Sequence, residues 1–127
     1  MKSLHIVTAL IEVGAGLALL AAPAVVVRAL LGAVLESPAT ETVGRVAGAA
    51  LLSLGVACWL ARSHGDRSAT GLVAAMLVYN TGAVAVLAAA GLGAEPVGIA
   101  LWPAVGLHAA MAVWCLACLK RCGRNSV

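Results

Sequence analysis

The chain has 127 residues, of which 63% are hydrophobic and only 10% are charged, and its formal net charge is +3. Soluble domains carry about 25% charged residues, so this composition excludes an ordinary soluble globular domain and favours one integral membrane domain. The basic residues do not cluster on an amphipathic surface, so we expect no nucleic-acid partner.

The first apolar run extends from Ile6 to Val27 and predicts a helix over residues 4–31. About 20 helical residues cross a hydrocarbon layer of about 30 Å, so the run is long enough to span a bilayer. Pro23 is expected to bend this helix near its outer end. We interpret the run as a retained helix and not as a cleaved signal peptide, because Glu12 interrupts the stretch that a signal would keep apolar.

The second run extends from Val43 to Ala61 and predicts a helix over residues 43–62, preceded by a surface ion pair between Glu41 and Arg45. Helices in lipid associate by close packing, and small residues four apart favour it. Such pairs occur on three of the runs: Gly14 with Ala18, Gly44 with Gly48, and Gly106 with Ala110. They predict a tight bundle.

The third and fourth runs predict helices over residues 70–92 and 96–119. Pro103 falls inside the fourth run, where it would remove one helix hydrogen bond. Two interpretations stay open: a kink that serves packing alone, or a bend that shapes a cavity beside His108. The predicted fold is therefore an all-α, integral membrane, up-and-down four-helix bundle in a single domain of residues 1–127.

The basic residues predict the orientation of this bundle. Six of the eight flank the same side: Lys2, Arg62, Arg67, Lys120, Arg121 and Arg124. The positive-inside rule then places both termini in the cytoplasm. Four crossings and two ends on one side agree with each other.

Polar side chains lie near the middle of each predicted helix. A carboxylate at this depth costs about 2.5–3.5 kcal/mol on insertion scales, so Glu12 is expected to face the bundle interior. His108 is its expected partner, because first and fourth helices are usually neighbours in an up-and-down bundle. His5 and Thr8 share the helix face of Glu12. The candidates for an ion, proton or substrate site are Glu12, Ser53, Tyr79, Asn80 and His108. The alternative is that Glu12 only holds helices together through hydrogen bonds.

A second pattern runs along the fourth helix, where soft or borderline metal ligands recur at spacings of 3-4-3-4: His108, Met111, Cys115, Cys118 and Cys122. Such ligands suit Cu(I) or Zn. The alternative is that Met and Cys act here as ordinary small hydrophobic residues. The sequence requires no cofactor, although copper, zinc or a quinone would be compatible with it.

The segment from Arg45 to Ala57, which follows a proline-bearing loop, resembles the second helix of the DoxX-like small four-helix bacterial membrane proteins. The resemblance implies a bacterial inner-membrane protein. Some members of those families are small subunits of quinone-dependent redox complexes. The resemblance carries no functional residue over to this chain.

Three functions remain compatible with the sequence. The leading prediction is an accessory or interaction subunit of a larger membrane complex, or a homo-oligomer. The first alternative is a minimal transporter or channel that uses Glu12 and His108. The second is a membrane redox or soft-metal-binding protein. An enzyme is not favoured, because the chain has no phosphate loop, no GxSxG and no HExxH.

Overall fold

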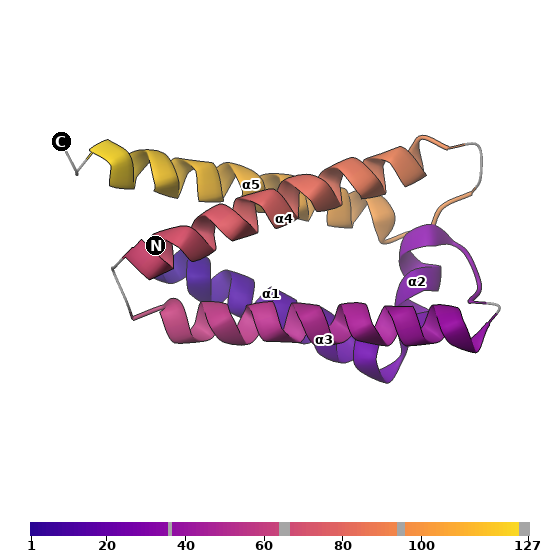
Figure 1. The fold of residues 1–127 in the computed structure, drawn as a ribbon. Helices are drawn as coiled ribbons and strands as arrows, with labels where there is room; N and C mark the ends of the chain where they lie inside the picture. The colour runs from indigo at the N-terminus through magenta and orange to yellow at the C-terminus, as the bar shows by residue number, and fades with distance from the viewer. Residues whose placement is uncertain (36, 64–66, 94–95, 125–127) are drawn as a thin grey trace.

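The computed structural model describes residues 1–35, 37–63, 67–93 and 96–124. Within them it is all-helical, as predicted, with no strand. The helices in chain order are α1 (Lys2–Ala21), α2 (Pro23–Leu31), α3 (Pro38–Ala61), α4 (Arg67–Gly91) and α5 (Leu101–Arg124) (Figure 1). By length and composition, α1, α3, α4 and α5 are long and apolar enough to cross a membrane.

The long helices alternate in direction, and the start of α1 and the end of α5 lie at the same end of the molecule (Figure 1). We call this the terminal end; α3 ends and α4 begins there. The opposite end holds α2, the end of α4 and the start of α5, and we call it the loop end. Helix α2 packs across the loop end beside α3 and α5.

The first predicted helix, over residues 4–31, is wrong in one respect: it is broken and not bent. At Ala22 the backbone has φ −143° and ψ 63°, and Pro23 begins α2. A proline lacks an N–H and disfavours the helical conformation in the residue before it. Helix α1 therefore ends at Ala21, and α2 turns away from it. Gly32, at φ +69°, ends α2 in the left-handed conformation that glycine adopts without strain.

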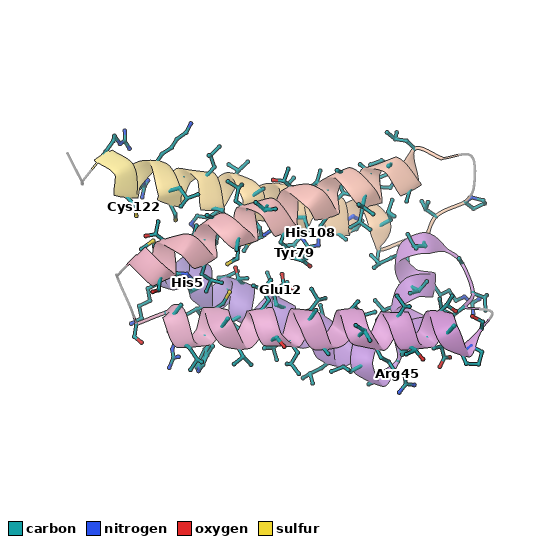
Figure 2. The ribbon with its side chains drawn as sticks, viewed as in Figure 1. His5, Glu12, Arg45, Tyr79, His108 and Cys122 are labelled. Atoms are coloured by element: carbon teal, nitrogen blue, oxygen red, sulfur yellow. The ribbon has the colours of Figure 1, made fainter. Side chains whose placement is uncertain are left out.

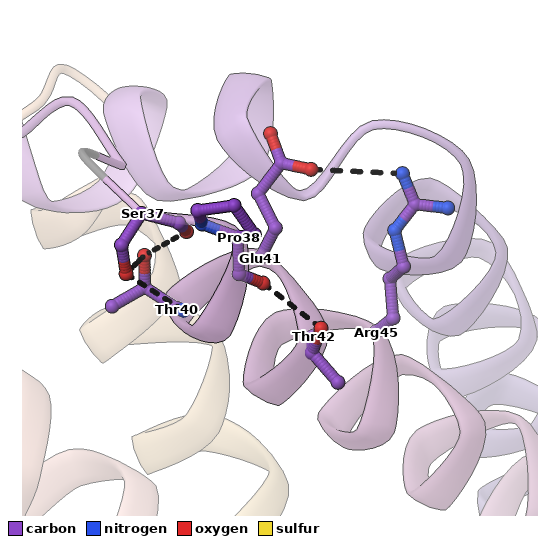
Figure 3. A network of polar contacts seen from close by, with 6 residues as sticks. All are labelled: Ser37, Pro38, Thr40, Glu41, Thr42 and Arg45. Carbon is purple, nitrogen blue, oxygen red and sulfur yellow. Dashed lines mark hydrogen bonds and ion pairs between the residues drawn. The ribbon is translucent and has the colours of Figure 1, made fainter.

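Helix α3 begins at Pro38, before the predicted start at residue 43. Ser37 caps it, because the main-chain N–H of Thr40 donates to the Ser37 hydroxyl at 3.3 Å (Figure 3). Proline is favoured in the first helical turn, where its missing N–H would have no helical acceptor anyway. Cap chemistry, and not hydropathy, thus sets this boundary.

The same close view shows the predicted ion pair: Arg45 Nη2 lies 3.8 Å from Glu41 Oε2 (Figure 3). The two residues are one helical turn apart, and both side chains are exposed. Such a pair contributes at most about 0.5 kcal/mol. It does not anchor the fold.

The predicted start of the fourth long helix is also wrong, because residues 96–100 are not helical and α5 begins at Leu101. Pro103 therefore lies in the first turn, where main-chain N–H groups have no helical acceptor. It removes no hydrogen bond from the helix interior, so neither a packing kink nor a cavity-shaping bend results. The predicted helix over residues 70–92 corresponds closely to α4.

The segment before α5 is held by α2. The N–H groups of Gly98 and Ala100 donate to the carbonyls of Leu30 and Ala29, at 3.1 and 2.8 Å. These carbonyls belong to the last turn of α2, which has no helical donors of its own for them. A Cβ on Gly98 would collide with the Ala29 carbonyl, so only glycine permits this approach. The connection thereby joins the two halves of the molecule at the loop end.

Helices α1 and α3 pack backbone against backbone through three glycines. A Cβ on Gly16 would lie 2.7 Å from the Leu52 nitrogen, one on Gly48 would lie 2.8 Å from the Gly16 oxygen, and one on Gly55 would lie 2.9 Å from the Val13 nitrogen. All three distances are too short for a real side chain. This close packing makes α1 and α3 neighbours.

The predicted small-residue pairs play unequal parts in this packing. Gly48 lies in the α1–α3 contact and Gly44 lies beside Pro23, whereas a Cβ on Gly14 or Gly106 would meet nothing within 4 Å. The pairs at Gly14 and Gly106 therefore do not pack helices within this chain.

The long helices thus form two pairs, α1 with α3 and α4 with α5. The expectation that α1 and α5 are neighbours is wrong for most of their length, because α1 packs on α3 and α5 packs on α4. An apolar cluster joins the pairs toward the terminal end; it consists of Leu4, Ala9, Cys58, Val73, Met76, Met111 and Cys115. The pairs are thus tied together near both ends and separate in between.

Candidate functional site

A cavity of about 920 Å³ lies between the two helix pairs. All five helices contribute to its walls, which are almost entirely apolar. Leu19, Val26, Leu51, Val86 and Leu107 are representative lining residues. Ligand pockets in proteins commonly measure about 300–1,000 Å³, so this cavity is large enough for a small organic molecule.

Three polar side chains line the cavity: Glu12 from α1, Tyr79 from α4 and His108 from α5. Figure 2 shows them near mid-length of the molecule, with Glu12 and Tyr79 directed toward each other across the gap between the pairs. Tyr79 is a side-chain hydrogen-bonding partner of Glu12. The structure therefore brings together three of the five candidates at one wall of an otherwise apolar space.

Glu12 is 3% exposed, and none of the described lining residues is a lysine or arginine. A buried carboxylate is stable when it is protonated or when a cation compensates its charge. Tyr79 offers it a hydroxyl but no charge. No hydrogen bond or ion pair joins Glu12 to His108 in the described part of the chain. Glu12 therefore faces the cavity without a fixed cationic partner.

His108 is held from behind by Asn80. Its Nδ1 lies 2.9 Å from Asn80 Oδ1, and Asn80 Nδ2 donates to the Met76 carbonyl at 2.8 Å. Because the Asn80 amide nitrogen is committed to that carbonyl, its oxygen faces the histidine and accepts a hydrogen from Nδ1. Nε2 is then the nitrogen that a neutral His108 offers as an acceptor.

Tyr79 adds a second contact to the same imidazole. The two rings meet edge to face, with centroids 5.5 Å apart and planes at 85°. Consecutive residues of α4 thus fix the position of His108, one through a hydrogen bond and one through ring packing. Asn80 is buried behind the cavity wall and does not line the cavity.

Ser53 does not join this site. Its side chain is exposed, and its hydroxyl donates to the Ala49 carbonyl of its own helix at 2.8 Å. The candidate Ser53 therefore lies outside the site, and α3 contributes only apolar residues such as Leu51 to the described cavity wall. Gly48 and Gly55 turn the opposite face of α3 toward α1, and this leaves Ser53 outside.

Two residues on the Glu12 face of α1 were noted in the sequence but not included among the site candidates. His5 is 0% exposed and Thr8 is 1% exposed. Neither ring nitrogen of His5 nor the hydroxyl of Thr8 has a hydrogen-bond partner within the described chain. Their shared face with Glu12 was the signal that pointed to them.

The sulfur-bearing residues of α5 spread along the helix and do not converge. Met111 and Cys115 lie in the apolar cluster, and Cys122 contacts the Met1 sulfur at 3.6 Å. In the same cluster, the Cys58 thiol donates to the Met76 sulfur at 3.3 Å. Within the ranges that the structure describes, no three His, Cys, Asp or Glu side chains gather as a metal site would require. Copper or zinc binding by His108, Met111, Cys115, Cys118 and Cys122 stays a prediction.

No family model matches the chain, and no curated protein or solved structure matches it either. The DoxX-like resemblance therefore stays a prediction, and functional conclusions rest on the geometry of the cavity.

Proposed function

We propose that this chain is an integral membrane protein that binds a lipophilic organic cation in the cavity and exchanges it for a proton at Glu12. This is the transporter alternative, made specific by the cavity. The observation that carries it is a nearly buried carboxylate, with no fixed cationic partner among the described lining residues, facing a large apolar space.

Membrane insertion is supported by the outer surface. Large apolar side chains are exposed along the middle of the long helices; Val78 and Val86, for example, are 74% and 70% exposed. Lipid covers such side chains without a free-energy penalty, whereas water does not. Trp59 and Trp102 are exposed near helix ends, as interfacial anchors are.

Orientation follows from charge. The basic residues of the terminal end include Lys2, Arg62 and Lys120, and the positive-inside rule assigns that end to the cytoplasm. The DoxX-like resemblance supports a bacterial inner membrane.

The ligand class follows from charge and polarity. Glu12 is stable in two conditions, protonated or paired with a positive charge. The apolar walls favour a cation with a large hydrophobic group attached to its charge. The Tyr79 ring adds a surface for a cation–π interaction. Because proton and ligand cation compete for one carboxylate, binding of one releases the other. This competition is the elementary step of proton-coupled exchange.

The proposal is tested with the purified protein in lipid nanodiscs and tetraphenylphosphonium as the probe. Isothermal titration calorimetry in two buffers of different ionisation enthalpy measures both affinity and proton release. We expect saturable binding with release of up to one proton, and binding weakened by about tenfold or more in Glu12→Gln, since each lost 1.4 kcal/mol is tenfold. Ser53→Ala, outside the cavity, is the matched control and should bind as the wild type does.

Equal binding by the wild type and Glu12→Gln would contradict the proposal, as would no binding by a folded wild type. A neutral quinone analogue that binds through His108 independently of Glu12 would instead support the redox alternative.

The accessory-subunit prediction has one observation in its favour. The faces of α1 and α5 that carry Gly14 and Gly106 are exposed and unpacked within the chain. Small residues of this kind suit contact with another membrane helix. Co-purification of a defined larger partner from native membranes, lost in Gly14→Leu or Gly106→Leu, would support it.

A further inference from the structure

Three buried polar side chains, His5, Thr8 and Glu12, form a row along one face of α1. They are three and four residues apart, which places them on the same side of the helix. Seven residues separate the ends of the row, a rise of about 10 Å. The row begins one turn from Met1 at the terminal end and finishes at the cavity wall.

The first two members of the row lack hydrogen bonds. His5 is 0% exposed and Thr8 is 1% exposed, and neither the imidazole nitrogens nor the hydroxyl has a partner in the described chain. The main chain of Met1 and Ala69 lies beside the imidazole. Leaving such groups unpartnered would cost about 1–3 kcal/mol each.

Thr8 differs from other helical hydroxyls of this protein. Thr42, Ser53 and Thr81 are exposed, and each donates to the carbonyl four residues earlier, at 2.8–2.9 Å. That local bond is the usual solution for a hydroxyl inside a helix. Thr8 is the more deeply buried residue, yet it does not make this bond. Its hydroxyl is therefore available to form a hydrogen bond with a species that lies along the row.

Water is the species that such a row suits. Buried water typically makes about three hydrogen bonds to polar groups that have no other partner. The imidazole nitrogens, the Thr8 hydroxyl and the Glu12 carboxylate supply both donors and acceptors in sequence. An imidazole also accepts a proton at one nitrogen and releases it from the other.

We infer that His5, Thr8 and Glu12 line a narrow hydrated path that carries protons between the terminal end and the cavity. The path would supply the proton that replaces the cation on Glu12, and this use of it rests on the proposed function. In that step the proton leaves the aqueous phase, passes along hydrogen-bonded water and His5, and adds to the carboxylate as the ligand cation leaves. No bond other than those to the proton changes.

Other titratable groups face the row from the surrounding elements. The Met1 amino group lies near His5. Tyr79 of α4 and Cys58 of α3 lie near Glu12, and His108 of α5 lines the same cavity. The neighbours from the apolar cluster, such as Val73 and Met76, bring no charge.

The path is tested by infrared spectroscopy of the full-length protein in nanodiscs. The carboxyl band of Glu12, identified by its loss in Glu12→Gln, is followed after transfer to D₂O. We expect wild-type exchange within the mixing time and exchange slowed about tenfold or more in Thr8→Val, a rate change equal to about 1.4 kcal/mol of barrier. Thr81→Val removes an exposed hydroxyl that bonds within its own helix and is the matched control. Wild-type rates in both variants would overturn the inference.

A second measurement keeps the inference falsifiable if Thr8→Val does not fold. In a variant with all four cysteines replaced by alanine, cysteine is introduced at Thr8 or at Ala9, which is 2% exposed and lies in the apolar cluster. After transfer to D₂O, the S–H stretching band of the introduced thiol should convert to S–D about tenfold faster at position 8, since only a hydrated thiol exchanges its proton readily. Equal rates at the two positions would overturn the path.

These measurements need no ligand. Exchange at Glu12 without tetraphenylphosphonium binding would overturn the proposed function and leave the path. Tetraphenylphosphonium binding together with equal thiol rates at positions 8 and 9 would overturn the path and leave the proposed function.

Discussion

The two helix pairs differ in whether their buried polar groups have hydrogen-bond partners within the protein. In the α4–α5 pair, Asn80 and His108 bond to each other, and Asn80 is further satisfied by the Met76 carbonyl. In the α1–α3 pair, His5 and Thr8 are as deeply buried as Asn80 and have no described partner. Satisfied polar groups hold helices together, whereas unsatisfied ones imply a mobile species such as water or a proton. In the proposed function, the polar row of the α1–α3 pair carries the chemistry, and the α4–α5 pair positions His108 and Tyr79 opposite that row.

The pairs also differ in how their backbones approach. Helices α1 and α3 touch through Gly16, Gly48 and Gly55, with no room for any side chain. Of the glycines on α4 and α5, Gly71, Gly82 and Gly106 face open space. A rigid α1–α3 contact keeps the polar row of α1 in place, because a shift of α1 would need all three glycine contacts to break. The following predictions test this contrast.

The largest effect is expected for Gly48→Leu. A side chain there would collide with the Gly16 carbonyl and the Leu19 side chain, so we expect a loss of about 4 kcal/mol or more, or failure to fold. Gly14→Leu, on the open face of α1, should change stability by about 0.5 kcal/mol or less. Unfolding in mixed micelles followed by circular dichroism measures both. Equal losses would show that α1 and α3 are not in backbone contact.

Asn80→Leu should have the next largest effect. It leaves the Nδ1 hydrogen of His108 without a partner, whereas the Met76 carbonyl keeps its main-chain donor within α4, and we expect a loss of about 1–2 kcal/mol. Thr81→Val is the control, because that exposed hydroxyl bonds only within its own helix. The same unfolding assay applies. A neutral result for Asn80→Leu would mean that the α4–α5 pair does not depend on its polar contact.

Thr8→Val should change stability in the opposite direction, or not at all. Because no described protein group bonds the Thr8 hydroxyl, replacing it with a methyl group breaks no hydrogen bond within the protein, so stability should stay constant or rise by up to about 1 kcal/mol. The measurement is the same micelle unfolding, compared with Asn80→Leu. A loss as large as that of Asn80→Leu would indicate a protein partner for Thr8 and remove the contrast between the pairs.

The smallest effect is expected for Glu41→Gln, which lies outside both the polar row of α1 and the Asn80–His108 contact. Its ion pair with Arg45 is exposed, so a loss of about 0.3 kcal/mol or less is expected, decreasing as salt is added. Unfolding at low and high ionic strength measures it. A larger loss that decreases as salt is added would mean that the loop end is held by charge and not by the contact of α2 with Gly98.

Some features followed from the amino-acid sequence without further information. Four apolar segments of sufficient length predicted the four long helices, because helix formation depends on local propensity and length. Counting along those segments predicted a common level for Glu12, Tyr79 and His108, which line one cavity in the structure. The broken first helix was predicted only as a bend, although Pro23 marked its position.

The arrangement of the helices was decided by tertiary structure alone. All faces of these apolar helices have similar hydropathy. The hydropathy pattern therefore did not show that Ser53 faces outward or that α1 packs on α3. Those choices depend on backbone contacts between residues far apart in the chain, such as Gly16 and Gly48. The same contacts separate the two pairs and so create the cavity. The sequence thus determined which polar groups lie near the middle of the long helices, and only packing decided which of them are buried and which found partners.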